Sequence, residues 1–152
     1  MPLTLFQDYN PEVLHTLTMP NTAANWRTWR TAAGELISPP PPPARYFSGG
    51  WAGLPALLRA ASLAGSYDLV ITAETVYAPP CCTPLLAAIK AALARPGGVA
   101  LVAAKAHYFG CGGSAAAFRA LAEADGELAV ETAWALDDGR SNARCILRLA
   151  WR

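Results

Sequence analysis

The fold is decided by the stretch Tyr67-Asp-Leu-Val-Ile-Thr-Ala-Glu-Thr-Val-Tyr77. Its apolar part, Leu69 to Thr72, predicts a buried strand that runs straight into an acidic residue, Glu74, and then an aromatic one, Tyr77. A carboxylate and a phenol are thereby placed at the carboxyl end of a strand, where open α/β sheets bind their ligands. The stretch therefore predicts a sheet and a site at its edge.

A second apolar run, Val99-Ala-Leu-Val-Ala-Ala-Lys105, leads into the polar cluster Lys105-Ala-His-Tyr-Phe-Gly-Cys-Gly-Gly113. Two strands that deliver polar groups to the same edge of one sheet favour a small-molecule site over a binding scaffold. The alternative is that strand ends are polar simply because they reach the surface.

Length and charge narrow the class of protein. The 152 residues suffice for one domain with its own core, and we expect a single domain over residues 1–152. A formal net charge of +1 provides no basic stripe for nucleic acid. No apolar run approaches the ~20 residues that a membrane span requires. We therefore expect neither a direct nucleic-acid partner nor a membrane.

The amino terminus and the cysteines indicate an intracellular protein without a metal site. The start, Met1-Pro-Leu-Thr-Leu-Phe-Gln-Asp8, lacks the charged and apolar regions of a secretory signal. Cys81 and Cys82 are adjacent, which is not the spacing of zinc ligands, and no second pair accompanies them. We expect four reduced thiols and a protein of the cytoplasm, the nucleus or both.

Strands and helices alternate along the chain, which closes in a hairpin. Asn10-Pro11 is a helix start, because Asn caps and Pro costs nothing at the first helical position. Five prolines, Pro39 to Pro43, favour a polyproline II surface loop over residues 38–44, and Asp137-Asp-Gly139 is a hairpin turn signal. The predicted elements are strand 3–6, a helix from residue 10, a second helix from Pro20 through Trp26 and Trp29, strand 45–47, helix 54–63, strand 69–72, helix 83–93, strand 99–104, helix 115–124, and strands 127–134 and 144–151.

Five motifs follow one another in a fixed order. They are Phe6-Gln-Asp-Tyr-Asn10, Leu17-Thr-Met-Pro-Asn21 with Asn25, Phe47-Ser-Gly-Gly-Trp51, the stretch 67–77 and Ala104-Lys-Ala-His-Tyr-Phe-Gly-Cys-Gly-Gly113. With them the chain resembles the C-terminal two-thirds of a class I S-adenosylmethionine-dependent methyltransferase, and within that group the histidine protein methyltransferases. The resemblance implies a Rossmann-like α/β sheet with helices on both faces and a C-terminal antiparallel hairpin. The implied activity is transfer of a methyl group from S-adenosyl-L-methionine to a histidine side chain of a protein.

The resemblance also implies a cofactor site. Asp8 follows a strand, and one carboxylate suits the two hydroxyl donors of a ribose; the alternative is that Asp8 begins an Asx-type turn. Gly49 and Gly50 allow close backbone approach, with the Trp51 indole beside them as an adenine platform. The expected cofactor-binding residues are Gln7, Asp8, Tyr9, Gly49, Gly50, Trp51 and Ala73.

Glu74 and Tyr77 are the catalytic residues that the resemblance implies. Methyl transfer from a sulfonium is an in-line displacement, in which orientation outweighs acid–base chemistry. We expect Glu74 to accept a hydrogen bond from the second imidazole nitrogen of the target, which fixes the tautomer and stabilises the cation that forms. The alternative is that Glu74 caps a helix or is simply exposed to solvent.

The substrate side of the expected site consists of Lys105, His107 and Tyr108. These residues are expected to lie along the target protein, which the resemblance suggests to be a ribosomal large-subunit protein. A lone histidine at a strand end is more often structural, so His107 is not expected to be catalytic.

Two features of the family are missing. Members usually carry an acidic residue where this chain has Gly50. Their sheet has the order 3-2-1-4-5-7-6, and its first strand ends in a glycine loop, but no Gly-x-Gly-x-Gly precedes Phe6. The chain therefore starts at the equivalent of strand two, and the absent strand lies between strands two and four. Strands two and four then pair directly, or another chain supplies the strand, or the chain is a truncated gene product; we expect truncation.

Two classes of function remain open. The first is an enzyme or its remnant, a protein-histidine N-methyltransferase, which Asp8, Glu74, Tyr77 and the block 105–113 favour. The second is a non-catalytic interaction module or inactive fragment, which the missing glycine loop and Gly50 favour.

Overall fold

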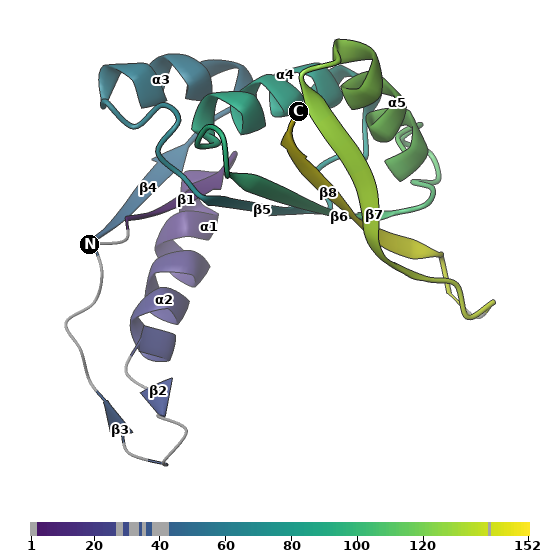
Figure 1. Ribbon diagram of the computed structural model, residues 1–152. Coiled ribbons are helices and arrows are strands. Elements are labelled where there is room, and N and C mark those ends of the chain that lie inside the picture. The colour runs from purple at the N-terminus through teal and green to yellow at the C-terminus, as the bar shows by residue number, and fades with distance from the viewer. Residues whose placement is uncertain (1–2, 27–28, 31–33, 35, 38–42, 140) are drawn as a thin grey trace. The chain divides into compact units, whose positions relative to one another are not determined.

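The computed structural model describes residues 3–26, 29–30, 34, 36–37, 43–139 and 141–152. The chain divides into two compact units, Met1–Gly50 and Trp51–Arg152, and each is described by itself. Both combine strands and helices (Figure 1), which confirms the α/β fold class.

The first unit is built on two parallel strands. β1 (Thr4–Asp8) pairs with β4 (Ala44–Ser48), in a register that sets Asp8 beside Ser48. Parallel strands cannot be joined by a tight turn, and the connection here contains α1 (Pro11–Val13), a π-helical segment (Leu14–Thr18) and α2 (Met19–Trp26). A short antiparallel pair follows, β2 (Trp29–Arg30) with β3 (Leu36–Ile37).

The predicted helix start at Asn10 is confirmed. Its side-chain oxygen accepts a hydrogen bond from the Glu12 N–H at 2.9 Å, and Pro11 is the first helical residue. The prediction of a helix through Trp29 is wrong, because α2 ends at Trp26 and Trp29 lies in β2. Aromatic and β-branched residues dominate the sequence around Trp29, and such residues favour strands. Of the predicted proline loop, residues 38–42 lie outside the described residues.

The second unit contains a four-stranded mixed sheet in the order β5-β6-β8-β7. β5 (Leu69–Ala73) and β6 (Val99–Lys105) are parallel, while β8 (Arg144–Trp151) runs antiparallel to both β6 and β7 (Leu128–Leu136). The C-terminal hairpin is therefore confirmed. The helices of this unit are α3 (Leu54–Ala60), α4 (Pro79–Ala92) and α5 (Ala115–Asp125), with a 3₁₀ turn at Trp51–Gly53.

The core of the second unit lies between the sheet and its helices, which all sit on one face of the sheet (Figure 1). Alternate residues of β6 point into the core, so that Ala100, Val102 and Ala104 are buried. They pack with Leu147 and Leu149 of β8 and, from the helices and loops, with Val76, Leu85, Leu86, Ile89 and Phe118.

The opposite face of the sheet differs from the sequence prediction. The expected buried strand, Leu69 to Thr72, is exposed on this face, with Leu69 at 52% and Ile71 at 70%. An apolar run indicates a strand that can be buried on both faces of its sheet. In the described part of this unit, helices cover only one face of the sheet. The prediction of helices on both faces is thus not met within this unit.

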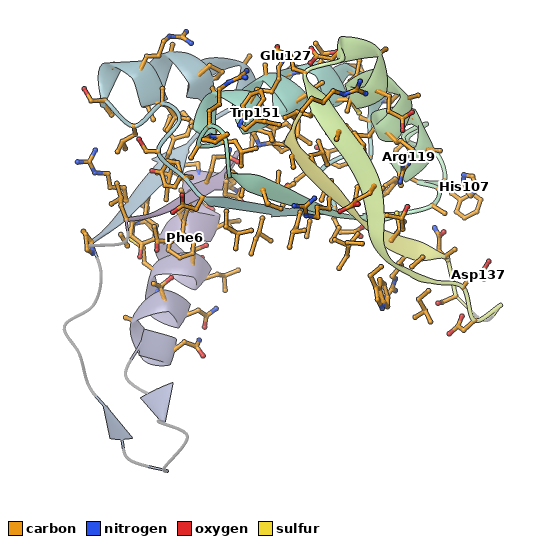
Figure 2. The ribbon with its side chains drawn as sticks, viewed as in Figure 1. Phe6, His107, Arg119, Glu127, Asp137 and Trp151 are labelled. Carbon is orange, nitrogen blue, oxygen red and sulfur yellow. The ribbon has the colours of Figure 1, made fainter. Side chains whose placement is uncertain are left out.

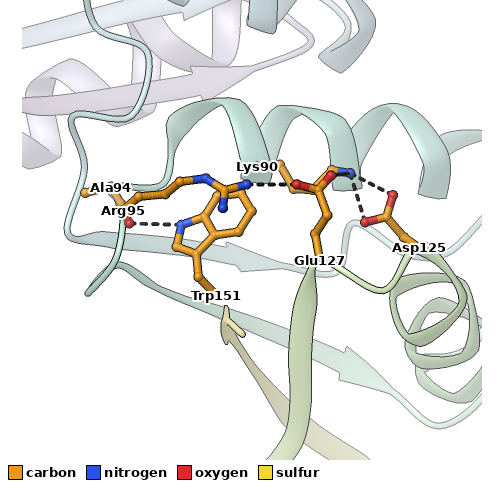
Figure 3. Close-up of polar contacts among 6 residues, drawn as sticks. All are labelled: Lys90, Ala94, Arg95, Asp125, Glu127 and Trp151. Carbon is orange, nitrogen blue, oxygen red and sulfur yellow. Dashed lines mark hydrogen bonds and ion pairs between the residues drawn. The ribbon is translucent and has the colours of Figure 1, made fainter.

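A charged network closes one end of the second unit (Figure 3). The Lys90 ammonium contacts Asp125 at 2.7 Å and Glu127 at 2.8 Å, and Arg95 contacts the second oxygen of Glu127 at 2.8 Å. The Arg95 guanidinium stacks over the Trp151 ring, whose N–H donates to the Ala94 carbonyl at 2.9 Å. The network joins α4, the end of α5, the start of β7 and the end of β8.

Candidate functional site

Glu74 lies directly beyond the carboxyl end of β5 and is tied to β6. Its N–H donates to the Ala103 carbonyl at 2.9 Å, which extends the β5–β6 ladder by one bond. Its φ of +56° is uncommon for a residue other than glycine and costs about 1–2 kcal/mol. Its carboxylate contacts the Lys105 ammonium at 3.0 Å. The structure therefore brings together an expected catalytic residue and an expected substrate residue.

Tyr108 completes this cluster beneath Lys105. Its hydroxyl accepts a hydrogen bond from the Lys105 N–H at 3.1 Å, and the Lys105 ammonium lies 5.6 Å from the centre of its ring. Burial raises the pKa of the Tyr108 phenol, the Lys105 N–H opposes that shift, and the nearby Glu74 carboxylate adds to it. The three side chains form one electrostatically coupled group, the Glu74–Lys105–Tyr108 cluster.

Backbone contacts hold the loop after β6 against the loop after β5. The Gly113 N–H donates to the Tyr77 carbonyl at 3.0 Å, and the Gly113 carbonyl accepts from the Tyr108 N–H at 3.1 Å. Any side chain at Gly113 would overlap the backbone of Val76 and Tyr77, so this position requires glycine. The two loops therefore behave as one piece, with the exposed Tyr77 side chain on its surface.

His107 and Ala73 stand apart from the cluster. The His107 side chain is exposed, on the outside of the loop that precedes α5 (Figure 2), and its carbonyl accepts from the Asn142 side-chain amide at 2.6 Å. Ala73 ends β5, beside Ala103 of β6, on the uncovered face. The structure thus anchors His107 through its backbone and leaves its imidazole in solvent.

The first unit gathers most of the expected cofactor residues at the carboxyl ends of β1 and β4. The Gln7 side-chain amide donates to the Gly49 carbonyl at 2.6 Å, and the Gly49 N–H donates to the Asp8 carbonyl at 3.0 Å. Gly49 has a φ of +132°, a conformation that side chains rarely adopt, and a Cβ at Gly50 would meet nothing within 4 Å. Tyr9 is largely exposed beside them.

Asp8 also forms an Asx-type turn, which is the alternative to a role in binding ribose. Its carboxylate accepts from the Asn10 N–H at 2.8 Å, which is an Asx-type turn. A carboxylate has about four acceptor sites, so this bond leaves capacity for a ligand. Trp51 belongs to the second unit, where it packs against the core.

Three contacts of the site were not predicted. The Thr72 hydroxyl donates to the Thr75 hydroxyl at 2.8 Å and stiffens the turn around Glu74. Asn142 reaches His107 from the hairpin, and Gly113 locks the two loops. None of these contacts had a signal in the sequence. Gly113 stands there only as the residue before Ser114, whose hydroxyl caps α5 by accepting from the Ala117 N–H at 3.0 Å.

The described residues contain no group of three or more histidine, cysteine or carboxylate side chains arranged to hold a metal ion. Among those same residues, no helix combines the length and the apolarity that crossing a membrane demands.

Comparison with known proteins gives a consistent result. No family model matches the chain. A curated histidine protein methyltransferase 1 homolog of Rattus norvegicus is 34% identical over 145 residues, which cover 88% of this chain and 40% of the rat protein. The homologs of Bos taurus and Dictyostelium discoideum are 33% and 30% identical, and each match covers 97% of this chain and 42% of the relative. The chain spans about two fifths of the length of these relatives, and over nearly all of its own length it is similar to histidine protein methyltransferase 1 homologs.

Proposed function

We propose that this chain carries the acceptor side and part of the cofactor side of a protein-histidine N-methyltransferase. The observation that carries the proposal is the 30–34% identity to proteins named histidine protein methyltransferase 1 homologs over about nine tenths of the chain. The reaction is transfer of a methyl group from S-adenosyl-L-methionine to an imidazole nitrogen of a target protein.

The sheet order supports the class I methyltransferase fold. The second unit has the order β5-β6-β8-β7, with the last strand of the chain inserted antiparallel between its neighbours. The final strands of the class I sheet are arranged in the same way, as 4-5-7-6. The parallel pair β1–β4 corresponds to strands 2 and 3, which are neighbours in that order.

The residues at the ends of β1 and β4 fit the ribose and adenine parts of S-adenosylmethionine. Asp8 keeps acceptor capacity, and the backbone at Gly50 is open to a ligand. S-adenosylmethionine would supply an electrophilic methyl group when bound. Asp8 and the backbone at Gly50 would bind and orient this donor. The methionine part has no matching glycine loop, because the sequence contains no Gly-x-Gly-x-Gly.

The Glu74–Lys105–Tyr108 cluster suits the acceptor side. The Lys105 ammonium contacts the Glu74 carboxylate at 3.0 Å, and Ala103 fixes the backbone from which that carboxylate projects. An ionised carboxylate can accept the N–H of a neutral imidazole and so leave the other nitrogen free to attack. Tyr77, on the adjoining loop, is exposed and available to flank the same imidazole.

We further propose that the acceptor belongs to a ribosomal large-subunit protein and that the protein works in the cytoplasm, the nucleus or both. The support is the resemblance of the five sequence motifs to the histidine-modifying methyltransferases. Mass spectrometry of ribosomal proteins incubated with the chain and methyl donor would locate any added methyl group, and a methyl group on lysine or arginine instead of histidine would contradict the assignment.

Two substitutions, made in a chain that also carries the family's upstream strand and glycine loop, separate the cofactor side from the acceptor side. Asp8→Ala removes a charged hydrogen-bond acceptor and should weaken donor binding by roughly 1.5–3 kcal/mol. Glu74→Gln should lower turnover on a histidine peptide at saturating donor while donor affinity stays nearly the same. Asp137→Ala is the control for the first, because Asp137 forms a similar turn by accepting from the Gly139 N–H. Glu123→Gln is the control for the second, because Glu123 is also an exposed, ion-paired carboxylate.

The alternative function is a non-catalytic module, which Gly50 favours, because members of the family that the chain resembles usually carry an acidic residue there. The same assay decides between the two. If a chain that carries the family's upstream strand and glycine loop adds no methyl group to histidine, and calorimetry detects no donor binding to it, the enzyme assignment is contradicted and the interaction module is favoured.

A further inference from the structure

The turn that follows β5 holds a strained residue at the point where the candidate acceptor site begins. Among the described residues, two other than glycine have a positive φ, Ser62 and Glu74, both at 56°. Ser62 follows the end of α3, and the left-handed conformation is a common way to end a helix. Glu74 follows a strand, and a long side chain adopts this conformation there only where surrounding contacts enforce it. Helix geometry therefore does not explain the strain at Glu74.

The left-handed conformation sets the face of the sheet on which the Glu74 carboxylate lies. The register pairs Ala73 with Ala103, so one further extended residue would stand Glu74 beside Ala104. Ala104 is buried in the core, where a carboxylate would lose its hydration. The Glu74 carboxylate instead contacts the ammonium of Lys105, which alternation along β6 places on the other face, with Ala103. The strained backbone thus directs Glu74 to Lys105.

One side-chain hydrogen bond spans this turn. The Thr72 hydroxyl donates to the Thr75 hydroxyl at 2.8 Å, and Glu74 lies between the two in sequence. Thr72 pairs with Val102, which is fully buried, so the bond forms on the helix-covered side of the sheet. The strand anchors the chain before Glu74, and the core anchors it at the fully buried Val76. The threonine pair closes the segment between these two anchors.

We propose that Thr72 is a positioning residue, which holds the left-handed turn through its bond to Thr75 and so directs the Glu74 carboxylate toward Lys105 and the imidazole of the acceptor. The part that concerns the imidazole rests on the proposed function, whereas the placement beside Lys105 does not. Thr72 acts only through Glu74. Without the Thr72 hydroxyl, the turn can relax from its strained conformation, and the carboxylate leaves Lys105.

Titration of Tyr108 in the 152-residue chain tests this placement. Burial raises the pKa of the Tyr108 phenol, and the Glu74 carboxylate raises it further, so this pKa reports where the carboxylate lies. Thr72→Val keeps the shape of the side chain and removes its hydroxyl. We expect the Tyr108 pKa, followed by carbon-13 resonances of labelled tyrosine, to fall in Thr72→Val, though by less than in Glu74→Gln. Thr75→Val breaks the same bond from the acceptor and should give the same fall, whereas Thr72→Ser keeps the hydroxyl and should retain the raised pKa.

A double substitution and a remote control separate positioning from stability alone. If Thr72 acts through Glu74, adding Thr72→Val to Glu74→Gln should leave the Tyr108 pKa where Glu74→Gln alone puts it. Thr132→Val is the matched control, because it removes a hydroxyl of β7 that accepts a hydrogen bond from Arg119 at 2.6 Å, and it should leave the Tyr108 pKa unchanged. An unchanged Tyr108 pKa in Thr72→Val, or the same fall with and without Glu74→Gln, would overturn the proposal.

Methyl transfer gives a second measurement, in a chain that also carries the family's upstream strand and glycine loop. There Thr72→Val should lower kcat on a histidine peptide about tenfold or more, because misplaced groups slow the chemical step. KM for the donor should stay nearly the same, and Thr72→Ser should retain activity. An equal kcat in Thr72→Val and the unsubstituted chain would contradict the positioning role. If the unsubstituted chain transfers no methyl group, the proposed function fails, while the titration still decides whether Thr72 places Glu74.

Discussion

Replacing Gly113 with alanine should destabilise the second unit more than any other glycine substitution in its loops. A Cβ at this position would approach the carbonyl groups of Val76 and Tyr77 far inside the 3.0 Å that real Cβ atoms essentially never cross. The obstructing atoms belong to the backbone, so no side chain can rotate to relieve the overlap. The loop at Gly113 and the loop at Tyr77 must therefore separate.

The size of the effect follows from what that separation breaks. Gly113 donates to Tyr77 and accepts from Tyr108, and each such hydrogen bond contributes about 1 kcal/mol. Overpacking of a close contact costs a further ~1–3 kcal/mol. Because relief of the overlap should sacrifice one hydrogen bond and retain part of the strain, we expect a loss of about 2–4 kcal/mol in the free energy of unfolding.

Two other glycines supply graded controls. Gly97 has open space around its Cβ and no positive φ, so Gly97→Ala should change the unfolding free energy by less than ~0.5 kcal/mol. Gly110 has open space but a φ of +76°, so Gly110→Ala should cost about 1–2 kcal/mol through backbone strain alone. Urea denaturation followed by circular dichroism measures all three. An unfolding free energy for Gly113→Ala equal to that of Gly97→Ala would refute the assigned contact.

Three further predictions concern binding and titration. The chain by itself should bind S-adenosylmethionine with a dissociation constant of about 1 mM or weaker, because only the ribose and adenine ends have partners; a low-micromolar value by calorimetry, about −8 kcal/mol, would contradict this. The pKa of the Tyr108 phenol, raised by burial, should fall toward its ordinary value in Glu74→Gln, which removes a negative neighbour, and rise further in Lys105→Met, which removes a positive one. Carbon-13 resonances of labelled tyrosine follow this titration. Shifts of the pKa in the reverse directions would contradict the Glu74–Lys105–Tyr108 cluster. Lys90→Met should lower stability at neutral pH by about 1 kcal/mol. The hydrogen bond from Lys90 lowers the pKa of Glu127. The stability that this carboxylate contributes is therefore present above its unfolded pKa and is lost as the pH falls through the lowered folded pKa. If the urea midpoints of the unsubstituted chain and of Lys90→Met declined equally with acid, the result would argue against the Lys90–Glu127 contact.

Apart from β2 and β3, the sequence predicted the order of the elements, because each signal was local. The alternating strands before and after Asp137-Asp-Gly139 form the β7–β8 hairpin, and Asn10-Pro11 begins α1 as expected. Trp29 was misassigned, although the aromatic and β-branched residues around it favour a strand, because that strand forms only by pairing with the two-residue β3. The burial of Leu69 and Ile71 was wrong for a related reason. An apolar run shows that a strand tolerates cover on both faces, but the cover itself depends on which elements pack there.

The sequence indicated that the ends of β5 and β6 would meet, but not which of their side chains would contact each other. The strand-end rule places Glu74 and Lys105 at one sheet edge, and the structure sets them 3.0 Å apart. Sequence reasoning gave Glu74 to the imidazole and Lys105 to the target protein, without foreseeing that they would contact each other. The role of Gly113 was also hidden, because it depends on a close approach of two backbones that are distant in sequence.

The Glu74–Lys105 contact bears directly on whether Glu74 is available to a substrate. The two side chains are 49% and 38% exposed, and pairs of that kind contribute only about 0–1 kcal/mol because water and salt screen them. A neutral imidazole that donates to Glu74 does not need to displace Lys105, since a carboxylate has about four acceptor sites. What the pair does provide is orientation: the Ala103 bond fixes the Glu74 backbone at one end, and Lys105 restrains the carboxylate at the other. Removing Lys105 should therefore disorder Glu74 more than it weakens the fold.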